Sequence, residues 1–296
     1  MSEEMQALAR GYALLGRMLL GHMSTAELAD AVALPGLCPA EDDVEASYVT
    51  AFDLGVPPYA SVFLDPRGHA GGAVTQRVEA AIRGAGLQPT TDEVAADHLG
   101  VMLVHLGTLT SLGRREEAAD FAARHLLGWL PALLVALDGV DAPFWRSAVE
   151  LALAIVLDEC PMAPRSVDAL VDNPLDDPSS GLREIAAWLA TPSRSGLWLG
   201  RNDLAAVSRA TDLPAGFGTR RDRIETLLRS AAEYDAVPRL CDALDNLVLE
   251  RTARLQGLGL PAPVLACWTT RLATTRSLLR TLGAKAGSSR QRRAGS

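Results

Sequence analysis

The sequence is poor in aromatic residues, which supply only 5% of the chain, and it contains one lysine, Lys285, so arginine carries nearly all the basic charge. The β-branched and aromatic residues that strands prefer are sparse, whereas Ala and Leu, which favour helices, are abundant. The hydrophobic content of 48% is ordinary for a globular protein and suffices for a sizeable core. The composition therefore predicts an all-α fold.

The chain also lacks the marks of several other protein classes. Its four cysteines, Cys38, Cys160, Cys241 and Cys267, show no C-x-x-C or Cys/His spacing, which argues against a zinc site or a disulfide framework and suits a reducing compartment. No basic n-region precedes an apolar stretch at the start, and no run reaches the ~18 apolar residues of a membrane span. The net charge of −8 argues against general nucleic-acid binding. We expect a cytoplasmic protein.

Apolar residues recur at helical spacing along most of the chain. Pro131 lies inside one such run and predicts a kink or a restart of the helix near Gly128 and Trp129. The pattern predicts helices over 4–22, a short segment after the cap Ser24-Thr25, 41–54, 73–84, from Thr91 through Leu109, 116–137, 143–158, 181–190, 202–210, 219–233, 236–256 and 262–283.

A stretch rich in Asp, Pro and Ser interrupts this pattern near residue 175 and is the best candidate for a boundary. We therefore predict a helical core over 1–172, a connection over 173–180 and a helical C-terminal extension over 181–283. Residues 284–296 have little apolar content and are expected to be a disordered tail.

A stiff aromatic loop begins at Pro57-Pro58-Tyr59. The two prolines fix φ and remove two backbone donors, so this segment cannot be a central strand. A preformed loop that carries an aromatic ring loses little entropy when it receives a ligand. The alternative is a rigid connection in which Tyr59 and Phe63 fill the core.

Asp97 and His98 form an acid–histidine pair that the pattern places on an apolar helix. A metal or acid–base site could use Glu93, Asp97, His98 and His105, but metal-binding helices present ligands three or four residues apart, and the H-E-x-x-H arrangement is absent. A second interpretation is a buried histidine that hydrogen-bonds neighbouring loops. We favour a binding surface over catalysis.

Three stretches together resemble the TorD/DmsD/NarJ family of redox-enzyme maturation chaperones. Residues 56–65, preceded by Tyr48 and Phe52, are similar to the family's P-P-[YW]-x-S-[VI]-[FWY] stretch. Residues 93–100 are similar to its signature ending in D-H-[LF]-G, without the proline often found after the Glu. Residues 121–131 are similar to its H-L-x-x-W-x-P helix, although the apolar spacing there also indicates ordinary core packing.

The resemblance covers about residues 5–155 and implies a compact multi-helix bundle that binds the apo catalytic subunit of a molybdopterin oxidoreductase, often at its twin-arginine signal peptide, until the cofactor is inserted. In this interpretation Asp97 meets a guanidinium of the peptide, while aromatic rings receive its apolar part. The implied peptide-binding residues are Tyr48, Phe52, Pro58, Tyr59, Asp97 and His98, with Glu93 beside them.

Alternatives remain. The chain could assist an apo-enzyme without a signal peptide, as in the nitrate-reductase branch of the family. From another class, it could be a helical metal-dependent enzyme that uses Asp97, His98 and His105. We expect no enzymatic activity, no bound cofactor, no nucleic-acid partner and no stable membrane insertion, and a homodimer formed by helix exchange stays open.

Overall fold

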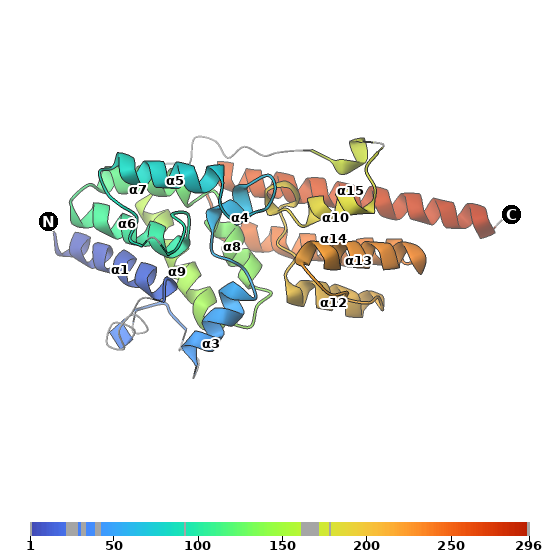
Figure 1. Ribbon diagram of the computed structural model, residues 1–296, viewed down its shortest axis with the longest axis horizontal. Coiled ribbons are helices and arrows are strands. Elements are labelled where there is room, and N and C mark those ends of the chain that lie inside the picture. Colours follow the sequence, from blue (N-terminus) through green and yellow to red (C-terminus); the bar gives the residue numbers. More distant parts are fainter. Residues whose placement is uncertain are drawn as a thin grey trace. The chain divides into compact units, whose positions relative to one another are not determined.

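The described part of the chain is helical. Among these residues no strand occurs, and one isolated antiparallel bridge joins Tyr59 to His98. The all-α prediction is therefore confirmed. The computed structural model (Figure 1) describes residues 2–21, 29–30, 34–38, 43–91, 93–160, 172–177 and 179–294, with only the backbone over 288–294. Most of the short helix expected after Ser24-Thr25 lies outside them, and its described residues 29–30 are helical.

The residues divide by their internal contacts into two compact units. The first comprises Met1–Val167 with Pro261–Val264, and the second comprises Asp168–Leu260 with Leu265–Ser296. Each has large side chains with almost no exposed surface, including Trp129 and Trp145 in the first and Trp268 in the second. Each unit thus has an apolar core of its own.

The first unit consists of short and medium-length helices. Ser2 caps the first of them, because its hydroxyl accepts a hydrogen bond from the backbone N–H of Met5. The elements are α1 (Glu3–Leu19), α3 (Val44–Tyr48), the π-helix η1 (Val49–Asp53), α4 (Ala60–Leu64), α5 (Ala73–Gly84), α6 (Leu99–Ser111), α7 (Arg115–His125), α8 (Leu130–Leu137) and α9 (Pro143–Glu159).

Helices α1 and α6 lie against each other in the first unit (Figure 1), and glycines permit their close approach. A Cβ added at Gly100 would lie 2.7 Å from the carbonyl oxygen of Gly16. A Cβ at Gly107 would lie 2.9 Å from the carbonyl oxygen of Ala9. Any larger side chain at these positions would push the two backbones apart.

Helices α7 and α8 are separate, as the position of Pro131 predicts. Pro131 lies in the first turn of α8, where its missing N–H costs no hydrogen bond. Phe121 and Trp129 are buried, which confirms that this stretch packs in the core.

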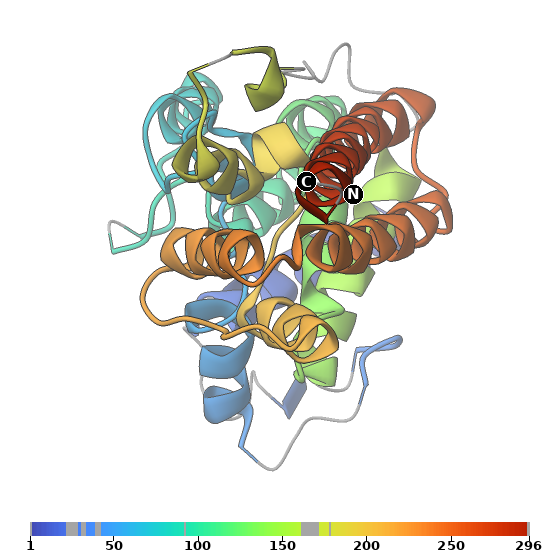
Figure 2. The ribbon, with the colours of Figure 1, turned by 90° about the vertical axis from the view of Figure 1, so that its right-hand side faces the viewer.

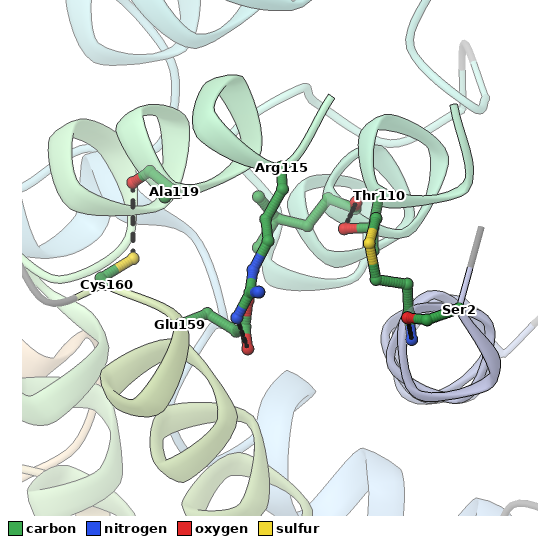
Figure 3. A network of polar contacts seen from close by, with 8 residues as sticks. Ser2, Thr110, Arg115, Ala119, Glu159 and Cys160 are labelled. Carbon is green, nitrogen blue, oxygen red and sulfur yellow. Dashed lines mark hydrogen bonds and ion pairs between the residues drawn. The ribbon is translucent and has the colours of Figure 1, made fainter. Parts of the chain in front are cut away.

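Polar contacts fix the end of α9 against α7 (Figure 3). Arg115 donates two hydrogen bonds to the carboxylate of Glu159, at 2.9 and 3.0 Å. The thiol of Cys160 donates to the carbonyl oxygen of Ala119 at 3.4 Å. Burial raises the pKa of this thiol to about 11. Cys160 is therefore a buried, protonated packing residue rather than a reactive thiolate.

The second unit is also helical, and Figure 2 shows α12, α13 and α14 in yellow to dark orange. Arg251 and Asp203 form a buried ion pair at 2.9 Å between α14 and α12. Arg220 stacks on Trp198 with its guanidinium carbon 3.6 Å from the ring centroid. The elements are η2 (Pro174–Asp176), α10 (Leu182–Leu189), α11 (Pro192–Ser195), α12 (Arg201–Thr211), α13 (Arg220–Glu233), α14 (Val237–Gln256) and α15 (Ala262–Ala294).

Helix α15 continues to Ala294, past Gly283, where the sequence pattern predicts its end. The added residues include Ala, Lys, Arg and Gln, which are good helix formers and need no apolar face to extend an existing helix. The low apolar content after Gly283 therefore does not mark the end of this helix.

No single helix of the described residues is long and apolar enough to cross a membrane. The pair α7 and α8, which meet at an angle of 59°, reaches the required length and composition only when the two are taken together.

Candidate functional site

The loop after η1 and the segment before α6 are joined through their backbones. The N–H of Leu99 donates to the carbonyl oxygen of Pro58 at 2.8 Å, and the N–H of Ala60 donates to that of Asp97 at 3.0 Å. This pairing brings together the two segments that the sequence analysis singled out. It also corrects one prediction: Asp97 and His98 do not lie on a helix, because α6 begins only at Leu99.

Asp97 holds this junction together from the inside. Its side chain has no exposed surface. One carboxylate oxygen accepts a hydrogen bond from the backbone N–H of Ser61 at 2.8 Å, and the other accepts one from the hydroxyl of Thr75 at 2.7 Å. Asp97 thus ties the first turn of α4 to α5, and in this conformation a guanidinium from outside cannot reach its carboxylate.

His98 is the N-cap of α6. Its Nδ1 accepts a hydrogen bond from the backbone N–H of Gly100 at 3.0 Å, and its ring contacts that of Tyr59 edge-on with centroids 4.8 Å apart. Burial lowers the pKa of His98 to about 4, against the opposing effect of Asp97. A neutral His98 is what the cap needs, because only an unprotonated nitrogen can accept. The structure agrees with the interpretation of a buried, hydrogen-bonded histidine.

The proposed metal ligands do not converge. His105 is buried with its ring centroid 4.5 Å from that of Phe121, which in turn lies 4.9 Å from that of His125. Burial lowers the pKa of His105 to about 4, with a further contribution from Arg114. Within the described ranges, no group of three His, Cys, Asp or Glu residues could hold a metal ion.

Tyr48 of α3 and Phe52 of η1 form an aromatic cluster with Trp145 of α9. Their rings lie 5.0 Å apart, and each meets Trp145 edge-on, at 5.1 Å for Tyr48 and 5.7 Å for Phe52. The hydroxyl of Tyr48 donates to the carbonyl oxygen of Leu19 at 3.0 Å. Phe52 is buried, whereas Tyr48 is partly exposed. Phe52 therefore packs beneath the accessible surface at the end of η1, and Tyr48 lies at the edge of that surface.

The accessible surface beside these rings comes from the end of η1. Asp53 is exposed, and Leu54 is 62% exposed. Burial raises the pKa of Tyr48 to about 12, and the charge of Asp53 and the neighbouring Tyr59 add to that rise. Burial also raises the pKa of Tyr59, followed by the charges of Asp97 and Asp53. Asp53 is therefore a negative charge close to both tyrosine hydroxyls.

The remaining predicted residues have different positions. Pro58 is buried and contributes its carbonyl oxygen to the junction, and Tyr59 is partly exposed. Glu93 is exposed, and its backbone N–H donates to the hydroxyl of Thr91 at 3.1 Å. Sequence reasoning did not single out Asp53 and Leu54, which form the exposed part of this surface. The available signal was an acid and an apolar residue placed directly after Phe52, where a helix ends before a stiff loop.

The segments of this site lie within a part of the chain that matches a protein-family model. Residues 22–135 match the protein-family model described as the nitrate reductase delta subunit. The match covers less than half of the chain, and this part of the chain is similar to that family. The family comprises chaperones of the NarJ and TorD type, which act in redox-enzyme maturation, so the resemblance found in the sequence is confirmed. A search of curated proteins found no match, and the second unit lies outside the matched residues.

Proposed function

We propose that this protein is a cytoplasmic, non-enzymatic assembly chaperone that binds the apo catalytic subunit of a molybdopterin oxidoreductase and holds it until the cofactor is inserted. The match of residues 22–135 to a family of chaperones supports the general role. The observation that carries the finer proposal is the hydrogen-bonded junction of Pro58 and Leu99, which leaves Tyr59 partly exposed where the charge of the exposed Asp53 contributes to raising its pKa.

This surface suits a peptide with a basic residue followed by apolar residues. An exposed carboxylate at Asp53 can receive a guanidinium in two parallel hydrogen bonds. The ring of Tyr59 can accept the flat face of the same guanidinium. Leu54 offers apolar area for the next part of the peptide. A twin-arginine signal peptide has this order of groups.

In this proposal the predicted residues divide their roles. Tyr48 and Tyr59 contact the peptide, with Glu93 as a second exposed acid. Phe52, Pro58, Asp97 and His98 position the contact surface, because all four are buried. Asp53 replaces Asp97 as the carboxylate that meets the arginine.

A second form of the same function fits the family equally well: the chaperone holds the apo-enzyme without using a signal peptide. The exposed Leu54 and Val49 favour it, because an apolar segment of an incompletely folded client could use them without any arginine. The two forms differ in whether peptide binding depends on basic residues.

Binding of the client in its apo and cofactor-loaded forms tests the general role. The client is first identified by capture followed by mass spectrometry, and its two forms are then compared for binding to the purified chaperone by titration calorimetry. We expect the apo form to bind and the loaded form to be released. Equal binding of both forms, or no binding of either, would contradict the proposed function.

The signal-peptide form is tested with the client's N-terminal peptide and a variant in which both arginines are replaced by glutamine. We expect the variant peptide to lose at least about tenfold in affinity, equal to about 1.4 kcal/mol, because two charge-assisted contacts disappear. An unchanged affinity would favour the form without a signal peptide.

A further inference from the structure

The charges of this chain are segregated along its length. Between Met18 and Pro66 there are eight Asp and Glu residues and no Lys or Arg. From Arg251 to Ser296 there are nine Lys and Arg residues and no Asp or Glu. Such an asymmetry within one acidic protein points to two surfaces of opposite sign rather than to a general effect on solubility.

The basic end forms one face of α15. Small residues follow one another along this face at helical spacing, and basic side chains flank them. The face is slightly hollowed and is lined by Ala273, Arg276, Ser277, Arg280, Thr281, Ala284 and Lys285. Small side chains let a second helix approach closely, while the flanking cations select a negatively charged one.

This face keeps an excess of positive charge. The carboxylate of Asp245 accepts two hydrogen bonds from Arg276, at 2.8 and 3.2 Å, and lies 3.8 Å from Arg280. One carboxylate therefore faces two guanidiniums. The side chain of Arg280 is 63% exposed, so it is accessible to a further acid.

The acidic end has its own exposed helical face in the first unit. Asp43, Glu45 and Asp53 are exposed on or beside α3 and η1, and the apolar side chains of Val49 and Leu54 lie in the same segment. Val44 to Asp53 spans about 14 Å, and Ala273 to Lys285 spans about 18 Å, at 1.5 Å per residue. The two faces are therefore of similar length and opposite charge.

We propose that the basic face of α15 docks on the acidic α3–η1 face of a second copy of this chain. The contact is head-to-tail, because two different faces meet. A second copy is the occupant that the chain itself supplies, with matched charge and matched length. The inference rests on the proposed function in one respect: docking covers Asp53, so a basic client peptide and the second copy compete for the same surface.

The test is the mass of the full-length protein in solution, measured by sedimentation at low and high protein concentration. At low salt we expect the average mass to rise with concentration. At high salt we expect monomers, because the screening length falls from ~10 Å at 0.1 M to ~3 Å at 1 M. A monomer at every concentration in low salt would overturn the proposal.

Charge-reversal variants test the contact itself. Arg280→Glu should weaken self-association at least about tenfold, since it places like charges opposite each other. Arg209→Glu, on the exposed side of α12, is the matched control and should leave it unchanged. Asp53→Arg should weaken association as Arg280→Glu does, and combining both reversals in one chain should restore it. Equal effects of Arg280→Glu and Arg209→Glu, or no restoration, would contradict the docking. Circular dichroism and urea unfolding confirm that each variant is folded.

The same variants separate this inference from the proposed function. Arg280→Glu should still bind client peptide, with higher apparent affinity at low salt because the competing copy is gone. A chain that binds client but stays monomeric disproves the docking alone. A chain that self-associates in this way but binds no client disproves the proposed function alone. Binding of acidic peptides or anionic vesicles to α15 without self-association would assign its basic face to another occupant.

Discussion

Two aspartates lie close to Tyr59, and one of them is buried whereas the other is exposed. Asp97 is fully buried and both of its carboxylate oxygens accept hydrogen bonds from Ser61 and Thr75. Asp53 is exposed at the end of a π-helix, a type of turn frequently found at functional sites. The comparison teaches that the recognisable motif builds the scaffold, whereas its less conspicuous neighbours form the accessible surface.

The largest expected effect comes from removing the buried aspartate. Asp97→Ala leaves the N–H of Ser61 and the hydroxyl of Thr75 without acceptors, and hydrogen bonds to a charged group contribute roughly 2 kcal/mol each. We expect the free energy of unfolding to fall by about 4 kcal/mol, measured by urea denaturation. Asp97→Asn keeps one acceptor oxygen and should lose less. Equal stability of Asp97→Ala and the natural protein would contradict a structural role.

Protonation of His98 at acidic pH should lower the free energy of unfolding. Its pKa is about 4 in the folded protein and about 6.5 when unfolded, so between these values the unfolded state binds more protons. The stabilisation is complete above pH 6.5 and is lost as the pH falls towards 4. At 1.36 kcal/mol per pKa unit the loss approaches about 3 kcal/mol. Urea unfolding at a series of pH values measures it.

His98→Asn is the matched variant for this pH dependence. Asparagine is a good N-cap residue and can still accept from the N–H of Gly100, but it does not titrate. We expect a shallower loss of stability in acid, with the remaining slope owed in part to His105, whose pKa is also about 4. An unchanged slope would show that His98 is not the group that titrates.

The helix pair beneath the junction offers a smaller effect. A Cβ at Gly16 would lie 2.7 Å from the carbonyl oxygen of Gly100, so Gly16→Ala should cost about 2 kcal/mol by overpacking. At Gly11, on the same helix, no atom apart from the adjoining helix backbone lies within 4 Å of the place that an alanine methyl would take, and Gly11→Ala should stabilise by about 0.5–1 kcal/mol. Thermal unfolding of both variants checks the contrast, and a similar change in both would contradict close α1–α6 packing.

Sequence reasoning predicted the elements of the fold well, because their apolar spacing and caps are local properties. The predicted range 73–84 coincides with α5, and the break at Pro131 separates α7 from α8. It placed Asp97 and His98 on a helix wrongly. Helix α6 begins only at Leu99 because the segment at its start pairs with Pro58 and Ala60, about forty residues earlier in the chain. Local spacing carries no information about these partners.

The burial of the site was equally hard to foresee. An acid beside a histidine has the same sequence pattern whether it faces solvent or the core. Only the positions of Ser61 and Thr75, on two other helices, show that the Asp97 carboxylate is already satisfied. Asp53 follows Phe52 without any motif of its own, so its accessibility became evident only from the structure.

The smallest expected effect on stability, and the most informative one for function, comes from the exposed aspartate. Asp53→Asn removes a charge that has no role in the junction, so the free energy of unfolding should change by less than about 0.5 kcal/mol. Binding of a basic client peptide should nevertheless weaken about tenfold in calorimetry, since the arginine loses its charged partner. Asp158→Asn, an exposed acid on α9, controls for net charge and should alter neither quantity. The opposite result is that Asp53→Asn binds the peptide as tightly as the natural protein, while Asp97→Asn is folded but binds it weakly. The arginine would then contact the buried Asp97 after a local opening, and the division between scaffold and surface would be wrong.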